Sequence, residues 1–378
     1  MSDADIIARI APGIASIDAG AWDRLAGAGN PFVSHAFLSA LEDSGSVGRG
    51  TGWQPLPIVI DGPGGLSGAL PAYGKSHSQG EYVFDQGWAQ AYEGAGGHYY
   101  PKLQIAVPFS PVPGPRVLAQ DPATAHALIA AAEALVRQNG LSSAHATFVS
   151  PDQLALFEDA GWLIRSDSQY HWANRDYRDF DDFLDALASR KRKAIRKERA
   201  AALAGIEIIQ LQGRAITEAD WDAFWVFYQD TGARKWGRPY LTRDFFSLLG
   251  ERMGDRLLLM FARRGGRAIA GALNLIGADT LYGRYWGCIE EVPFLHFELC
   301  YYQAIEAAIA RRLARVEAGA QGDHKLARGY EPVATWSAHY IADKGFRGAV
   351  SDFLRREREA VAHDIAALTE MGPFKRSG

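Results

Sequence analysis

The stretch from Leu281 to Tyr330 constrains the fold most, because its pattern follows the order strand, loop, helix, strand, loop. Trp, Tyr and Gly alternate in its first part, and apolar residues then recur at helical spacing from Phe297 to Leu313. A short strand over residues 315–320 leads into a polar loop flanked by Gly. A helix between two strands in this way is typical of α/β folds.

The same stretch places titratable side chains among aromatic ones. The titratable residues are Arg284, Glu290, Glu291, His296, Glu298, Glu317, Asp323, His324 and Lys325. The aromatic residues are Tyr282, Tyr285, Trp286, Phe294, Phe297, Tyr301 and Tyr302. Apolar walls strengthen the few polar contacts set among them, so this mixture predicts a small-molecule site.

Strands also alternate with helices over the rest of the chain, which predicts an α/β protein. At 378 residues the chain is long for one core, and we expect two domains. The predicted boundaries are 1–178 for an N-terminal domain, 179–205 for a long basic amphipathic helix that joins the halves, and 206–378 for a C-terminal domain with the main active site. Three short matches between the halves suggest a duplication: Gly68–Leu70 with Gly271–Leu273, Trp88 with Trp286, and Tyr99-Tyr100 with Tyr301-Tyr302.

Composition narrows the class of protein. Hydrophobic residues make up 48% and charged residues 22%, as in folded globular proteins, and the net charge of −4 gives no global attraction to nucleic acid. Two cysteines, Cys288 and Cys300, offer neither a disulfide framework nor a metal-ligand spacing, so we expect no metal. The acidic N-terminus is unlike a signal peptide, and no apolar run approaches a membrane span. We therefore expect a cytoplasmic protein that is at most peripheral to the inner membrane.

Several motifs carry a resemblance to a known family. They are Asn30-Pro-Phe-Val-Ser-His-Ala-Phe-Leu38, Tyr100-Pro-Lys-Leu103, Val107-Pro-Phe-Ser-Pro111, Ser189-Arg-Lys-Arg-Lys193, Leu281-Tyr-Gly-Arg-Tyr-Trp-Gly287, Glu291-Val-Pro-Phe-Leu-His-Phe-Glu298 and Glu317-Ala-Gly-Ala-Gln-Gly-Asp-His-Lys325. With them the chain resembles the FemAB-like family of predicted N-acyltransferases, which is labelled peptidoglycan biosynthesis/recognition. The resemblance implies two tandem GNAT-like domains with mixed sheets flanked by helices. It also implies acyl transfer to an amine, since Fem ligases use aminoacyl-tRNA, most GNAT relatives use acyl-CoA, and some members are taken to be ceramide synthases.

Acyl transfer to an amine needs a base for the ammonium proton, donors for the oxyanion and a proton for the leaving group. The candidate catalytic residues are Glu298, His324, His296 and Glu317. Glu298 and His296 flank the start of a helix, although Glu298 can equally serve as a helix cap. Glu317 lies in the centre of a short strand, where a charge is rare unless it is paired or working. The alternative is that Glu317 or Asp323 forms a salt bridge with Lys325 that only shapes the loop.

Further residues are candidates for binding. Those expected to contact the substrate are Arg284, Tyr285, Trp286, Tyr301, Tyr302, Asp323 and Lys325. The basic run 190–199 has seven cations against one acid, and its Arg190, Lys191 and Lys193 are candidates for the phosphates of acyl-CoA. The same run can bind anionic lipid headgroups, or be a solvated helix face.

The donor is less defined, because Glu290-Glu-Val-Pro-Phe-Leu-His296 holds two acids and no Gly where GNAT proteins cradle a pyrophosphate. The predicted donor is acyl-CoA or an acyl-carrier-protein thioester. The predicted reaction transfers a fatty acyl group to a primary amine, most specifically a long-chain sphingoid base, to give a ceramide-type amide. One alternative is a Fem-like ligase that uses aminoacyl-tRNA on a peptidoglycan precursor, the one case with a nucleic-acid partner. Another is a non-catalytic module that binds cell-wall peptides.

Overall fold

The computed structural model describes residues 6–236, 239–319 and 322–375, without the side chains of residues 231–236 and 323. The chain divides into two compact units, each made of two segments. Unit 1 comprises Met1–Asp167 and Ala334–Ala362, and unit 2 comprises Ser168–Val333 and His363–Gly378. The division therefore differs from the predicted boundaries at residues 178 and 205. It differs because the chain returns to unit 1 after residue 333, through a strand that the sequence reading did not include.

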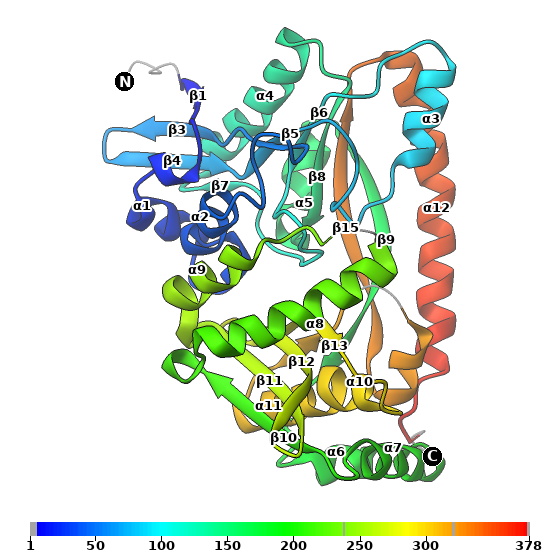
Figure 1. Ribbon diagram of the computed structural model, residues 1–378. Helices are drawn as coiled ribbons and strands as arrows, with labels where there is room; N and C mark the ends of the chain where they lie inside the picture. The colour runs from blue at the N-terminus through cyan, green and yellow to red at the C-terminus, as the bar shows by residue number, and fades with distance from the viewer. Residues whose placement is uncertain (1–5, 237–238, 320–321, 376–378) are drawn as a thin grey trace. The chain divides into compact units, whose positions relative to one another are not determined.

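Unit 1 contains two sheets (Figure 1). In the first, the order is β1-β3-β4-β7, with strands Ala8–Ile10, Ile58–Gly62, Gly65–Leu70 and Leu118–Ala119. In the second, β2, β5, β6 and β8 span Trp53–Pro55, Ala72–Lys75, Lys102–Ile105 and Ser143–Val149. Its helices are α1 (Ala19–Ala26), α2 (His35–Asp43), α3 (Gln86–Gly94), α4 (Pro122–Gln138), α5 (Leu154–Asp159) and most of α12 (Lys344–Glu370).

The centre of unit 1 is the β6–α4–β8 segment. Helix α4 begins sharply because Asp121 accepts a hydrogen bond from the backbone N–H of Thr124 and Pro122 occupies the first turn. Strands β6 and β8 then pair in parallel, with Gln104 opposite His145. Apolar residues of α4, including Leu128 and Ile129, pack with both strands in one core cluster. This is the strand–helix–strand unit that the alternating pattern predicts.

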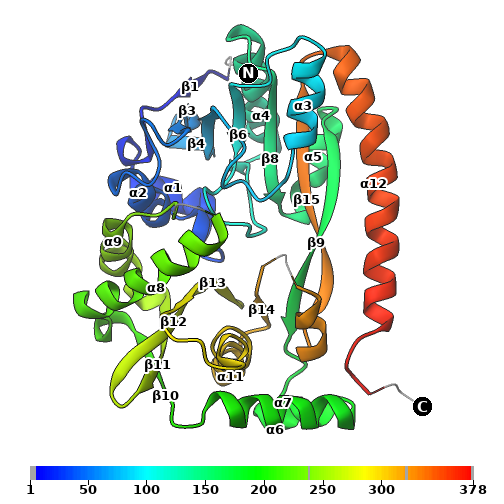
Figure 2. The ribbon, with the colours of Figure 1, turned by 45° about the vertical axis from the view of Figure 1, so that its right-hand side comes forward.

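Unit 2 has one sheet in the order β10-β11-β12-β13-β14-β9. The strands span Glu207–Gln212, Leu257–Arg264, Arg267–Ile276, Thr280–Cys288 and Arg315–Glu317, and β9 spans Leu163–Ala173. The helices are α6 (Phe180–Ala186), α7 (Ser189–Ala202), α8 (Glu218–Trp236), α9 (Arg243–Met253), α10 (Leu295–Phe297) and α11 (Gln303–Ala310). A π-helical turn, η6 (Glu298–Tyr302), joins α10 to α11, and a 3₁₀ segment, η7 (Asp323–Arg328), follows β14. Figure 2 shows α6 and α7 on the side of α11 that faces away from the sheet.

Unit 2 repeats the central arrangement of unit 1. Strands β13 and β14 pair in parallel on either side of the α10–η6–α11 helix, as β6 and β8 do on either side of α4. A further antiparallel strand follows in each sheet: β9 pairs with β14, and β15 (Glu331–Ile341) pairs with β8. Each unit is thus completed by a strand from the other half of the chain.

The duplication predicted from the sequence therefore holds at the level of the strand–helix–strand unit, but two of its residue matches do not. Trp88 lies in α3 whereas Trp286 lies in β13, and Tyr99-Tyr100 precede β6 whereas Tyr301-Tyr302 follow β13. The predicted helix over 179–204 is two helices, because the chain breaks at Leu187 and Ala188, which bond to Phe374 and Pro373. Among the described residues, no helix combines the length and apolar character that a bilayer crossing requires.

Candidate functional site

In unit 2, Glu317 ends β14 at the point where this strand stops accompanying β13. The two strands pair only from Thr280–Tyr282 to Arg315–Glu317, and β13 then continues to Cys288 against β12 alone. Glu317 is only 7% exposed, and its Oε2 accepts no hydrogen bond from the described residues. Arg315 Nε lies 3.7 Å from Oε1, and His171 Nε2 lies 3.9 Å from Oε2. A buried carboxyl without full hydrogen bonding is costly, so this position calls for a functional explanation.

The surroundings perturb the titration of both Glu317 and His171. Burial raises the pKa of Glu317 to about 8, although Arg315 and Arg284 oppose the rise. Burial lowers the pKa of His171 to about 3, with smaller contributions from Arg315 and Lys325. The imidazole is therefore neutral near pH 7, while the carboxyl exchanges its proton near pH 8. A group of this kind can act as a general base or acid.

Next to Glu317, strand β13 carries a bulge. The ladder pairs Leu273 with Tyr285 and Asn274 with Gly283, so Arg284 between them has no Cα partner on β12. Bulges turn backbone groups out of the ladder and are common beside active sites. Tyr282, which also lies on β13 and is the register partner of Glu317 on β14, is buried. The bulge and the buried carboxyl thus both lie where β14 ends and β13 continues.

Four predicted site residues gather around the turn that starts the helix. The His296 ring lies 5.2 Å from Trp286 and 5.3 Å from Tyr301, measured between centroids. His324 Nε2 lies 2.9 Å from the Tyr301 hydroxyl, and the His296 and His324 centroids are 6.4 Å apart. Burial raises the pKa of Tyr301, so its phenol stays protonated. The π-helical turn at Glu298–Tyr302 sets this spacing, and such turns are frequent at functional sites.

The surroundings of Glu298 are unlike those expected of a catalytic base. Its carboxylate is fully buried and accepts two hydrogen bonds from Arg199, of 2.8 and 3.0 Å, and one from Gln303. Arg199 also binds Glu306. With both oxygens engaged by a guanidinium, Glu298 fixes α7 to the π-helical turn, and this favours a structural role.

The remaining predicted residues are spread around the unit. Tyr302 donates to Glu198, which also pairs with Arg328, and Tyr285 packs on Tyr228 and Phe246. Lys325 is buried and donates to the carbonyls of Ala318 and Gly319, so it closes the loop after β14. The side chain of Asp323 lies outside the described part of the structure. Glu290, in the acidic segment before the helix, forms an ion pair with Arg264 at 2.5 Å.

The three cations expected to hold a cofactor lie on α7. Arg190 and Lys193 are exposed, Lys191 is half-buried, and none of the three forms an ion pair within the described residues. Two other cations of this helix are neutralised, Arg192 by Asp185 and Arg196 by Asp181. The helix thus leaves part of its charge uncompensated on the surface.

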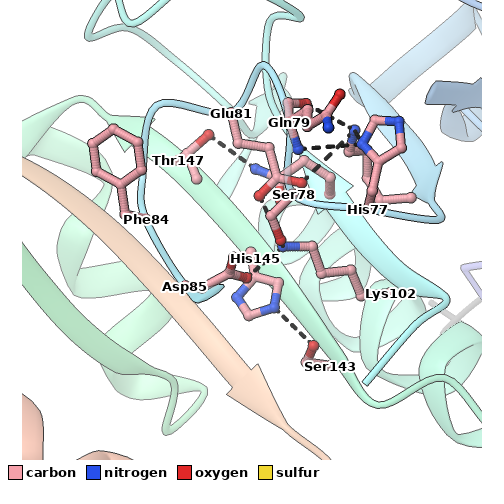
Figure 3. Close-up of polar contacts among 12 residues, drawn as sticks. His77, Ser78, Gln79, Glu81, Phe84, Asp85, Lys102, Ser143, His145 and Thr147 are labelled. Carbon is pink, nitrogen blue, oxygen red and sulfur yellow. Dashed lines mark hydrogen bonds and ion pairs between the residues drawn. The ribbon is translucent and has the colours of Figure 1, made fainter. Parts of the chain in front are cut away.

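A second polar cluster lies inside unit 1, where the sequence reading expected none (Figure 3). Lys102 of β6 has no exposed surface and donates to Glu81 at 2.8 Å, to Ser78 at 2.9 Å and to Asp85. Tyr99 donates to Asp85 at 2.7 Å, and His145 of β8 lies 2.7 Å from His339 between Nδ1 atoms. One sequence feature could have indicated this cluster: Lys102 and Gln104 stand at alternate positions of a strand that is otherwise apolar.

Charge compensation governs the titration of this cluster. Burial alone would raise the pKa of Asp85, but Lys102 lowers it to about 2. Burial would likewise lower the pKa of Lys102, but Glu81 and Asp85 raise it. Burial raises the pKa of Glu81 to about 7, although Lys102 opposes the rise. Burial lowers the pKa of His145 to about 3. The cluster is a paired ionic network, which is most consistent with a structural role.

Comparison with known families identifies the chain. Residues 13–376 match the model of the FemAB-like family, described as peptidoglycan biosynthesis/recognition. The chain belongs to this family. No curated protein matches the FemAB-like chain.

Solved structures share the fold of this FemAB-like protein. FemX matches with a TM-score of 0.55 and 11% identity over 89% of this chain and 98% of that chain. L-PGS from Bacillus licheniformis matches with a TM-score of 0.51 and 8% identity over 84% and 95%. A conserved protein of unknown function from Bacteroides thetaiotaomicron matches with a TM-score of 0.51 and 11% identity over 88% and 99%. The expected α/β fold is confirmed, and FemX and L-PGS share it over most of their length. Family and fold together support an acyl- or aminoacyl-transferase.

Proposed function

We propose that this FemAB-like protein transfers an acyl or aminoacyl group to a primary amine, with Glu317 as the general base. The observation that carries the proposal is the buried Glu317 at the end of β14, beside β13, with one oxygen that accepts no hydrogen bond from the described residues. A pKa of about 8 suits a base that must take a proton from an ammonium group near neutral pH.

The reaction would proceed by direct attack. Glu317 takes a proton from the substrate ammonium, and the freed amine forms a bond to the donor carbonyl carbon. A backbone N–H of β13 beyond the segment that pairs with β14 would stabilise the oxyanion. The carbonyl then re-forms as the bond to the leaving sulfur or oxygen breaks, and the Tyr301 phenol gives that atom a proton. The amide nitrogen gives up its second proton to His324, which is hydrogen-bonded to Tyr301 and passes this proton on to the phenolate.

The finer proposal concerns the substrates. A fatty-acyl thioester as donor and a long-chain sphingoid base as acceptor would give a ceramide-type amide, and the aromatic group of Trp286, His296 and Tyr301 would line an apolar substrate. The Fem-like alternative, aminoacyl-tRNA with a peptidoglycan precursor, has support of equal weight, since FemX shares the fold. The contact of Glu290 with Arg264 weakens the argument that this segment repels a phosphorylated donor.

The exposed cations of α7 support a phosphorylated or anionic partner. We propose that Arg190, Lys191 and Lys193 contact the phosphates of CoA or tRNA, or an anionic membrane surface. An acyl-carrier-protein donor would use the same surface, through its acidic groups. All of these partners predict binding that weakens with salt.

A mass-spectrometric assay tests the proposal. Purified protein is incubated with palmitoyl-CoA and sphinganine, and separately with aminoacyl-tRNA and a peptidoglycan precursor, with and without nuclease. An amide that forms in one reaction and is lost in Glu317→Gln identifies the donor and supports the base. Glu331→Gln is the matched control, because Glu331 pairs with Arg175 on the surface of the same unit. A folded protein that forms no amide with either donor would support the non-catalytic peptide-binding module instead.

A further inference from the structure

Unit 1 contains a cavity of about 520 Å³ between its second sheet and the end of α4. This volume lies within the ~300–1,000 Å³ typical of small-molecule pockets. Five apolar side chains contribute to its lining: Ile10, Leu56, Pro101, Leu135 and Leu141. All belong to unit 1, as do the other lining residues, so the cavity shares no lining residue with the Glu317 site of unit 2.

The cavity offers almost no charge to a ligand. Lys75 is the one lining residue that carries a charge, and its side chain has no exposed surface. Its Nζ donates to the Gln79 carbonyl at 3.2 Å, and it lies 3.7 Å from the centroid of the Trp53 ring and 3.8 Å from Glu81. The ammonium group is thus occupied inside the protein. The other polar lining side chains, Gln54, Ser76 and Asn139, are neutral. A phosphate, carboxylate or ammonium group of a ligand would therefore find no accessible opposite charge in this cavity.

The rim of the cavity continues the apolar surface outward. Ile10 lines the cavity and is 45% exposed, and Ile6 and Ile7, just before it in the chain, are 49% and 75% exposed. Three large aliphatic side chains exposed within five residues indicate contact with something apolar. The opposite part of the lining is backbone-rich: a Cβ on Gly48 or Gly50 would meet no heavy atom within 4 Å. The opening is therefore not obstructed by side chains at these two positions.

We propose that this cavity binds an uncharged aliphatic chain, such as the hydrocarbon chain of a lipid. Aliphatic walls and an aliphatic rim fit such a chain, and the lack of an accessible charge disfavours a nucleotide or an aminoacyl group in this position. The chain can come from a substrate of the transfer reaction or from a membrane lipid, and the chemistry is the same in both. The inference rests on unit 1 alone and does not require the proposed function.

Binding of the neutral fluorophore N-phenyl-1-naphthylamine to the full chain tests the site. We expect saturable binding with one site per chain, and displacement of the fluorophore by 1-hexadecanol. Leu135→Trp fills the cavity and Ile10→Glu places a charge at its rim, and each should weaken binding about tenfold, equivalent to ~1.4 kcal/mol. Leu156→Trp is the matched control, because Leu156 packs against the same core without lining the cavity.

Absence of saturable binding to the folded protein would overturn the proposal, as would equal binding by the two cavity variants and the wild type. Because Ile10 is half-exposed, Ile10→Glu remains informative if Leu135→Trp does not fold. The source of the chain is resolved by two readouts. A rise in KM for long-chain but not short-chain substrates in Leu135→Trp assigns a substrate, and weaker binding to phosphatidylglycerol vesicles with unchanged KM assigns a membrane lipid. The binding result stands even if no amide forms, which separates this proposal from the proposed function.

Discussion

The β6–α4–β8 segment of unit 1 and the β13–α11–β14 segment of unit 2 share one arrangement, and both bury a titratable residue at the third position of their last strand. In unit 1 this residue is His145, opposite Gln104, and in unit 2 it is Glu317, opposite Tyr282. Around His145 the charges are matched, with Lys102 bonded to both Glu81 and Asp85. Around Glu317, the distances to Arg315 (3.7 Å) and His171 (3.9 Å) are too long for hydrogen bonds.

This difference shows that burial of ionisable groups does not by itself identify a functional site. Unit 1 buries more of them, and one oxygen of Glu81 and one of Asp85 also accept no hydrogen bond from the described residues, but both carboxylates accept from Lys102. Glu317 has no cation within hydrogen-bond distance among the described residues, and in our proposal a substrate ammonium takes this place. We therefore expect substitutions in unit 1 to act on folding and those at Glu317 to act on the reaction.

The largest effect should follow from Lys102→Met. It removes the cation between Glu81 and Asp85. Asp85 then keeps the Tyr99 hydroxyl, and Glu81 keeps Lys75 at the longer distance of 3.8 Å. Loss of one member of a buried ion pair costs about 3–5 kcal/mol, so the free energy of unfolding, measured by chemical denaturation, should fall by that amount. Adding Glu81→Gln and Asp85→Asn should recover part of the loss. Unchanged stability together with lost transfer would reverse the roles that we assign to the two units.

Glu317→Gln should separate activity from stability. We expect the rate of amide formation to fall about 100- to 10,000-fold, the usual contribution of a general base. In the wild type, kcat/KM should rise with pH through about 8 as Glu317 loses its proton. A residual rate above one tenth of the wild type, with the same pH profile, would exclude Glu317 as the base.

The contributions of Glu317 and Asp85 to the free energy of unfolding should depend on pH in opposite directions. The folded pKa of Glu317 is raised from 4.5 to about 8, so its stabilising contribution is complete below 4.5 and is lost as pH rises through 8. The folded pKa of Asp85 is lowered from 3.8 to about 2, so its contribution is present above 3.8 and is lost as pH falls through 2. Differential scanning calorimetry should show Glu317→Gln gaining in melting temperature over the wild type toward pH 9. The melting temperature of Asp85→Asn should fall furthest below that of the wild type near pH 7, and least near pH 2.

Sequence reasoning reached the fold because alternating strands and helices and the family motifs point the same way. It also selected Glu317, since a charge in a short buried strand stands out without any structure. It could not rank Glu317 above Glu298, because the partner of Glu298 is Arg199, almost a hundred positions earlier in the chain. His171 was missed for a similar reason: it meets Glu317 only because β9 pairs with β14. The Lys102 network and the cavity arise from tertiary packing that local periodicity does not contain.

Glu298→Gln extends the comparison within unit 2. The amide keeps the shape of the side chain but removes the charge that faces Arg199, which retains Glu306. Charged hydrogen bonds contribute about 1.5–3 kcal/mol, so we expect a loss of stability of this size and a change of less than about tenfold in transfer. A loss of transfer as large as that in Glu317→Gln, with unchanged stability, would make Glu298 the base instead.

The same contrast between matched and unmatched charge applies to α7, where the expected effect is smallest. Arg190→Gln with Lys193→Gln removes two cations that lack ion pairs within the described residues, whereas Arg192→Gln with Arg196→Gln removes two that are paired with Asp185 and Asp181. Each cation near an anionic surface contributes about 1 kcal/mol, or roughly fivefold in affinity. The first double variant should therefore raise KM for a phosphorylated donor, or weaken vesicle binding, and should flatten the dependence on salt. A larger effect of Arg192→Gln with Arg196→Gln would contradict this expectation. It would mean that the ion pairs with Asp185 and Asp181 orient α7 for binding, and that the exposed Arg190 and Lys193 only contact solvent.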